Sequence, residues 1–152
     1  MGATNDNGTL SGLGNLIIGY DENPPTSAIA NPQYRSGSHN LIVGRANQFP
    51  NFGFGNLIAG ENNYANGECG FIAGANNTIY QLNASVCGGQ YNTVGGNFNV
   101  IVGGSYNAIN QTGDVLVGGY ACGEIGTYSV MLGGYFAEFS PAFAVVHGTI
   151  TP

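Results

Sequence analysis

The chain has 152 residues, enough for one domain, and 27 Gly and 20 Asn make up close to a third of it. Charged residues are 7% of the chain, and eight acids against two arginines, Arg35 and Arg45, give a formal charge of -6. Binding to nucleic acid or to an anionic membrane needs clustered Lys and Arg, so the composition excludes both kinds of partner. No apolar run reaches the length that spans a bilayer, so we expect no membrane insertion.

A short apolar strand that ends in Gly recurs nine times along the chain. The nine copies occupy residues 16–19, 41–44, 57–60, 71–74, 85–88, 100–103, 115–118, 130–133 and 145–148. After the first interval their glycines recur with a nearly constant period, which indicates internal repeats. Beyond the Gly an Asn opens a second, shorter strand, as at 77–79, 92–94 and 107–109, and Cys122 and Ala137 take the place of this Asn in the last copies.

A repeat of about 14 or 15 residues has room for two short strands and two tight turns, because each strand residue advances ~3.3 Å. One such coil cannot bury its apolar side chains alone, so successive coils must stack as parallel rungs. We therefore expect an all-β, parallel β-roll (β-solenoid) with Gly at its corners and a structural Asn column whose amides bond from rung to rung. We place the β-roll at 14–148, after a lead-in at 1–13 and before a tail at 149–152.

Three consecutive apolar positions in nearly every copy of the first strand predict that both faces of this strand are buried. One face can fill the interior of the roll, and self-association is the simplest source of a partner for the other. We assign the residues that flank the middle of these strands to packing in the core or between copies: Leu41, Val43, Leu57, Val100, Val102, Val115, Val117, Val130 and Leu132.

Four segments, 14–19, 39–44, 55–60 and 99–103, match a strand pattern of the form Asn-Ser-Val-Ala-Ile-Gly. In this pattern and in its coil length the chain resembles the head repeats of YadA-like trimeric autotransporter adhesins, over roughly residues 14–148. Similar rolls occur in phage tail fibres and in surface fibres of predatory bacteria. The resemblance implies a left-handed β-roll, a homotrimer and an extracellular place at the tip of a bacterial or phage surface fibre. The chain departs from the family at the middle strand position, where it has Ile or another large residue and the family often has Ala.

The first interval between strands, from Gly19 to Gly44, is much longer than those that follow, which predicts an inserted loop at 20–38. This loop is rich in Pro, and rigid loops on a stable scaffold commonly carry recognition residues. With the following coil it supplies a candidate receptor site for an acidic group such as a sialic acid or a uronate. The candidate residues are Tyr34, Arg35, Arg45, Phe49, Phe52 and Phe54. The alternative is that the loop caps the open end of the stack.

The polar residues show no catalytic or metal-binding spacing. His39 and His147 fit no Ser-His-Asp or metal-ligand pattern. The pairs Glu61 with Glu68 and Asp114 with Glu124 could serve as glycosidase carboxylates only across a cleft, which a narrow roll lacks, so we expect solvated charges. No cofactor, no metal and no enzymatic activity are expected, and a glycan-cleaving tail spike remains only as a residual alternative.

The tyrosines fall into columns of the repeat. Tyr91 and Tyr106 share one column, and Tyr120 and Tyr135 share another, which predicts stacked ladders on adjacent rungs. The alternative is that the same rings stack on sugars while neighbouring Asn side chains bond hydroxyl groups.

The three cysteines, Cys69, Cys87 and Cys122, occupy different places in the repeat, so we expect no intrachain disulfide. Cys87 replaces Val or Ala in a strand and is expected to be buried. Cys122 replaces a turn Asn and is expected to be more accessible.

These features predict a non-enzymatic, homotrimeric adhesin or fibre-tip head that binds a cell-surface receptor, either a glycan or a protein. The runner-up is a purely structural segment of a longer fibre.

Overall fold

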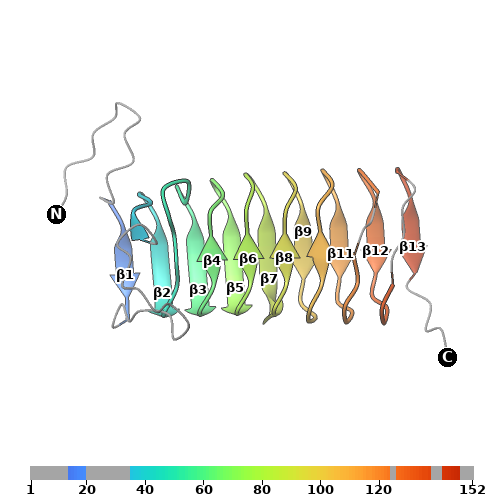
Figure 1. Ribbon diagram of the computed structural model, residues 1–152, viewed down its shortest axis with the longest axis horizontal. Coiled ribbons are helices and arrows are strands. Elements are labelled where there is room, and N and C mark those ends of the chain that lie inside the picture. Colours follow the sequence, from blue (N-terminus) through green and yellow to red (C-terminus); the bar gives the residue numbers. More distant parts are fainter. Residues whose placement is uncertain (1–13, 20–34, 124–125, 138–141, 148–152) are drawn as a thin grey trace.

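The computed structural model describes residues 14–19, 35–123, 126–137 and 142–147, and every named element in these ranges is a β-strand. The strands stack along one axis into a rod (Figure 1). In the described part of the chain no helix has the length and apolar character needed to cross a membrane.

Nine strands form one parallel sheet whose spatial order follows the chain. These strands are β1 (Leu16–Ile18), β2 (Leu41–Arg45), β3 (Leu57–Glu61), β5 (Phe71–Ala75), β7 (Ser85–Gln90), β9 (Val100–Val102), β11 (Val115–Val117), β12 (Val130–Leu132) and β13 (Val145–His147). All nine coincide with the apolar repeats of the sequence, so the predicted parallel β-solenoid is confirmed.

The register of this large sheet follows the repeat. Val115 of β11 pairs with Val100 on one side and with Val130 on the other. His147 pairs with Leu132, as its place in the repeat predicts. β1 pairs directly with β2 although the sequence between them is the longest such interval, so no strand of this sheet intervenes. Residues 20–34 of the predicted loop lie outside the described residues.

A second, four-stranded parallel sheet lies across the coil from the large one. It consists of β4 (Tyr64–Ala65), β6 (Thr78–Ile79), β8 (Thr93–Val94) and β10 (Ala108–Ile109), in the order β10-β8-β6-β4. These are the short strands that the sequence places after each Asn. They have only two residues each, because so short a coil must also make two turns.

The core is a single row of apolar side chains between the two sheets. Side chains alternate along a strand, so the middle residue of each three-residue apolar segment points inward and its two neighbours point outward. The inward residues of the large sheet are 0–3% exposed: Ile42, Ile58, Ile72, Val86, Ile101, Leu116 and Met131. From the small sheet Ala65, Ile79, Val94 and Ile109 complete the row.

Most coils turn through two corners at which residues other than Gly adopt left-handed backbone conformations, with φ between 50° and 59°, and Gly14, Gly55 and Gly113 hold the remaining corners before large-sheet strands. Before the large-sheet strands these residues are His39, Cys69, Asn83, Phe98, Tyr128 and Phe143; before the short strands they are Ala46, Asn62, Asn76, Tyr91, Tyr106, Ala121 and Phe136. The sequence indicated Gly and Asn for such corners, whereas the coil also imposes this conformation on aromatic residues and on Ala, at a cost of about 1–2 kcal/mol each.

The cysteines reverse the predicted accessibility. Cys87 is the third residue of its apolar segment, so its side chain faces outward and is exposed, whereas Cys122 is buried in the column of the turn Asn residues. The prediction was wrong because it took the whole strand as buried and the whole turn as open. All three cysteines are free thiols.

Candidate functional site

The outward positions of the large sheet form a continuous apolar surface, which we call the outer stripe. It contains all nine residues that the sequence assigns to core or inter-copy packing, and none of them lies in the core. Six are 36–42% exposed (Leu41, Val43, Leu57, Val102, Val117 and Leu132), and Val100, Val115 and Val130 are half-buried. Leu16 and Ile18 extend the stripe at the β1 end, and the exposed Cys87 lies within it.

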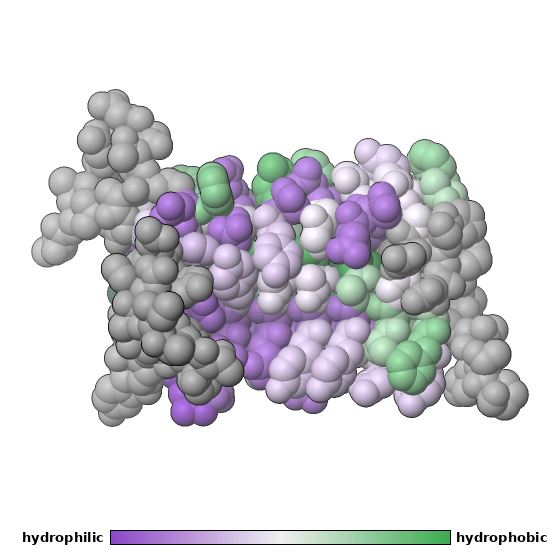
Figure 2. All heavy atoms as spheres, in the orientation of Figure 1, coloured by the Kyte–Doolittle hydropathy of each residue, from purple (hydrophilic) through white to green (hydrophobic). Residues whose placement is uncertain are grey.

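Another side of the rod is mainly polar. Figure 2 shows a face on which polar side chains dominate and hydrophobic residues are seen in separate patches. Apolar exposure is therefore uneven around the coil.

The structure gives the residues of the predicted receptor site different surroundings. Tyr34 lies outside the described residues. The Nε of Arg35 donates to the carbonyl of Asn47 at 3.5 Å, and Arg45 forms an ion pair with Glu61 on the next strand. This pairing offsets the positive charge that was expected to attract an acidic sugar.

The three phenylalanines of the predicted site have different surroundings. Phe49 is 1% exposed and packs in the core, so it is not available to a ligand. Phe54 stacks at a tilt on His39, with ring centroids 5.0 Å apart. Phe52 alone presents a largely exposed ring.

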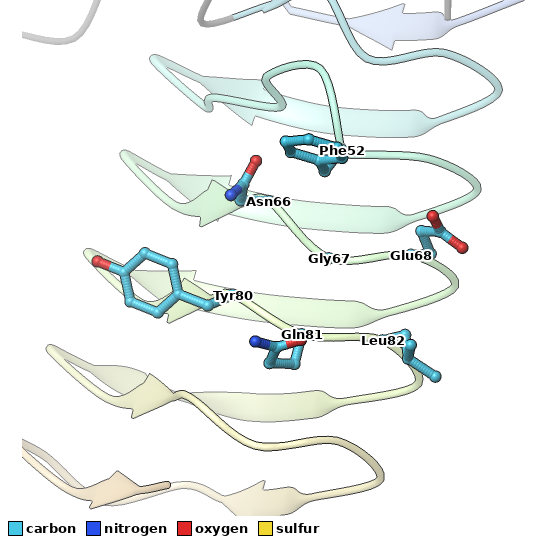
Figure 3. Close-up of a pocket in the computed structure, with 7 residues that line it drawn as sticks. All are labelled: Phe52, Asn66, Gly67, Glu68, Tyr80, Gln81 and Leu82. Carbon is cyan, nitrogen blue, oxygen red and sulfur yellow. The ribbon is translucent and has the colours of Figure 1, made fainter. Parts of the chain in front are cut away.

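Phe52 instead lines a pocket of about 260 Å³ that sequence reasoning missed. The other lining residues are Asn66, Gly67, Glu68, Tyr80, Gln81 and Leu82 (Figure 3). The signal was present in the sequence, because positions 52, 66 and 80 are equally spaced by one repeat. Stacking of consecutive coils therefore places 52–54, 66–68 and 80–82 side by side. A parallel β-bridge between Phe54 and Glu68 shows this register.

Two buried Asn ladders run through the coils. In the first, Asn47, Asn63, Asn77, Asn92 and Asn107 each accept, through Oδ1, the backbone N–H of the next member, and the ladder ends at Cys122. The second starts at Asn15, Asn40 and Asn56 and resumes at Asn99. These side-chain amides form hydrogen bonds between coils, which confirms the structural interpretation of the Asn column.

Asp114 continues the second ladder and is fully buried, so its prediction as a solvated charge was wrong. Its Oδ1 accepts the N–H of Ser129 at 2.9 Å, and its Oδ2 has no partner among the described residues. Burial raises the pKa of Asp114 above its ordinary value, and the hydrogen bond from Ser129 opposes this shift only in part.

The tyrosine columns are stacked as predicted. The ring centroids of Tyr91 and Tyr106 lie 4.8 Å apart, and those of Tyr120 and Tyr135 lie 5.4 Å apart, with interplanar angles of 14° and 15°. A tilted contact of 5.5 Å between Tyr106 and Tyr120 joins the two pairs. The two inner rings therefore have ring neighbours on both sides, which leaves little room for a sugar to stack on them.

A scan against models of protein families, a search of curated proteins and a search of solved structures each found no match to this chain. Within the described ranges no three His, Cys, Asp or Glu side chains gather where they could hold a metal ion. The candidate functional features are thus the outer stripe and the pocket beside Phe52.

Proposed function

We propose that this chain is the non-enzymatic, homotrimeric head of an extracellular fibre, with a receptor on a cell surface as its partner. The observation that carries the proposal is the outer stripe. In the three-residue apolar segments from β1 through β12 of the large sheet, Ser85 is the only outward residue that is polar, and none is charged. Large ordered apolar patches of this kind are typical of interaction sites.

A second copy of the chain suits the stripe better than an unrelated partner does. The stripe repeats with the coils along the rod, so copies related by an axis parallel to the rod bring equivalent rows of Val and Leu together on every rung. Three copies around such an axis follow from the resemblance to trimeric head repeats. The assembly is a rigid rod of fixed length, which suits the tip of a fibre.

Cys87 offers a direct test of this assembly. It is exposed in the outer stripe of the isolated chain, whereas Cys69 is exposed at the corner that precedes β5. In native protein we expect a maleimide reagent to modify Cys69 readily and Cys87 slowly, with equal labelling after denaturation. Sedimentation at micromolar concentration should give the mass of three chains. A folded monomer in which Cys87 reacts as fast as Cys69 would overturn the proposal.

Receptor binding requires a separate measurement. The assembled protein, consisting of this chain alone, should bind intact cells or printed glycans. The buried Asn ladders favour a second candidate, a structural segment that only extends a longer fibre. A stable trimer that binds neither cells nor glycans would favour this structural role over receptor binding.

A further inference from the structure

The pocket beside Phe52 is built from three consecutive coils. Phe52 comes from the first coil, 66–68 from the second, and 80–82 from the third. Figure 3 shows the middle coil crossing between the other two, with the side chain of Asn66 directed towards the coil that carries Phe52. The pocket lies in the segments that follow the short strands, away from the long strands that form the outer stripe.

Gly67 provides a rigid floor for this pocket. A Cβ at this position would lie 1.9 Å from the carbonyl oxygen of Gln81, so only Gly allows the two coils to approach this closely. The carbonyl of Gly67 also accepts the Nδ2 of Asn56 at 2.8 Å, which ties the floor to the second Asn ladder. The floor is therefore a close backbone contact between two coils, and the hydrogen bond from Asn56 holds it in place.

The polar side chains around this floor are uncommitted. Among the residues that the structure describes, no hydrogen bond or ion pair engages the side chains of Asn66, Glu68 or Gln81. The side-chain oxygens of the ladder asparagines, in contrast, accept hydrogen bonds from the backbone of the next coil. Two amides and one carboxylate thus offer donors and acceptors to a ligand.

Two aromatic rings flank these polar groups. Phe52 and Tyr80 are both exposed, and the ring of Phe52 makes no contact with another ring in the described ranges. A pyranose sugar has hydroxyl groups around its edge and an apolar face of C–H groups, which fits amides and a carboxylate placed beside an exposed ring. The volume of about 260 Å³ is smaller than that of sites for drug-sized ligands and suits a single sugar residue.

We propose that this pocket is a binding site for one neutral pyranose residue of a glycan, recognised through Phe52, Tyr80 and the side chains of Asn66, Glu68 and Gln81. The inference deepens the proposed receptor-binding function and rests on it. An acidic sugar is disfavoured because Glu68 is the only charged residue that lines the pocket, and its carboxylate would repel a second negative charge.

The test uses the assembled wild-type protein and saturation-transfer NMR. The probes are the methyl β-glycosides of glucose, galactose and N-acetylglucosamine, with sialyllactose as the acidic comparison. We expect saturation transfer to at least one neutral glycoside. The double variant Phe52→Ala/Tyr80→Ala should weaken that binding about fivefold or more, since aromatic contacts contribute about 0.5–1.5 kcal/mol each. Gln81→Ala should weaken it as well.

The matched control is Phe136→Ala, because Phe136 is 63% exposed and Phe52 is 64% exposed, and Phe136 lies outside the pocket. It should leave sugar binding unchanged, and the double variant should keep the wild-type melting temperature. Neutral-sugar binding that survives the double variant would overturn the site. Transfer to sialyllactose alone would overturn the ligand class. Binding to cells without transfer to any glycoside would overturn this inference and leave the proposed function standing, whereas absence of both would overturn the two together.

Discussion

The side-chain oxygen of Asn92 accepts the backbone N–H of Asn107, one coil further along, at a donor–acceptor distance of 3.1 Å. The Nδ2 of the same Asn92 donates to the Oδ1 of Asn77 and to the carbonyl of Gly104 at 3.1 and 3.0 Å. One buried amide therefore connects three consecutive coils. Repetition of this contact reinforces the backbone hydrogen bonds that join successive coils.

The first prediction concerns this ladder. Asn92→Ala leaves the buried N–H of Asn107 and the carbonyl of Gly104 without side-chain partners, so we expect a loss of about 2–3 kcal/mol in the free energy of unfolding. The exposed Asn110 provides the control, because Asn110→Ala should change stability by less than about 0.5 kcal/mol. Urea unfolding of both variants at one protein concentration measures the difference. Equal stability of the two variants would contradict a structural role for the amide.

The second prediction separates the core from the outer stripe. Ile101 points inward and is fully buried, whereas its neighbour Val102 points outward and is 42% exposed. Ile101→Asp buries an unpaired carboxylate in the coil itself and should prevent folding. Val102→Asp places its charge only between copies, so it should give a folded chain that no longer associates.

Circular dichroism measures the folding of the two variants, and sedimentation measures their mass. The β signal should be lost in Ile101→Asp and retained in Val102→Asp, while the mass of the latter should fall to that of one chain. A Val102→Asp protein that keeps the wild-type mass would show that the stripe is not the contact between copies.

The third prediction concerns pH. Because burial raises the pKa of Asp114 in the folded chain, the folded state favours the neutral acid. The stabilising contribution of this group is therefore present below its unfolded pKa and is lost as the pH rises through the raised folded value. Asp114→Asn supplies a neutral side chain with a donor at the unpaired Oδ2 position, so we expect it to stabilise the protein at pH 7 by about 1–3 kcal/mol.

The gain from Asp114→Asn should shrink as the pH falls, because the wild-type acid then becomes protonated in both states. Thermal unfolding of the two proteins between pH 3 and pH 8 gives the comparison, and subtraction cancels the titration of the other acids. A gain that is independent of pH would exclude ionisation of Asp114 as its cause.

The fourth prediction concerns the corners. Ala121 adopts a φ of 53°, a conformation that costs about 1–2 kcal/mol for a residue with a Cβ. Gly removes this strain but gains entropy in the unfolded chain, so Ala121→Gly should raise stability by about 0.5–1 kcal/mol. Ala108 lies in β10 and is not among the residues of positive φ, so Ala108→Gly should lower stability by a similar amount. Calorimetry should show melting temperatures that move in opposite directions, and two decreases would refute the strain argument.

The sequence by itself determined the solenoid and its register. Glycines that recur with a nearly constant period place like residues on like rungs, and side chains alternate along a strand, so Ile101 and Val102 must point to opposite sides. The Asn ladder was also predictable, because a column of identical amides at the rung spacing can bond to itself.

The tertiary structure alone decided which residues are available to a partner. Burial depends on where a side chain lies around the coil, so Phe49 enters the core while Phe52, on the same turn, stays exposed. The same cause exposes Cys87 and buries Cys122 and Asp114. The pocket arises because three coils contribute to it and Gly67 lets two of them approach closely, a relationship between neighbouring rungs that composition and spacing within one repeat do not contain.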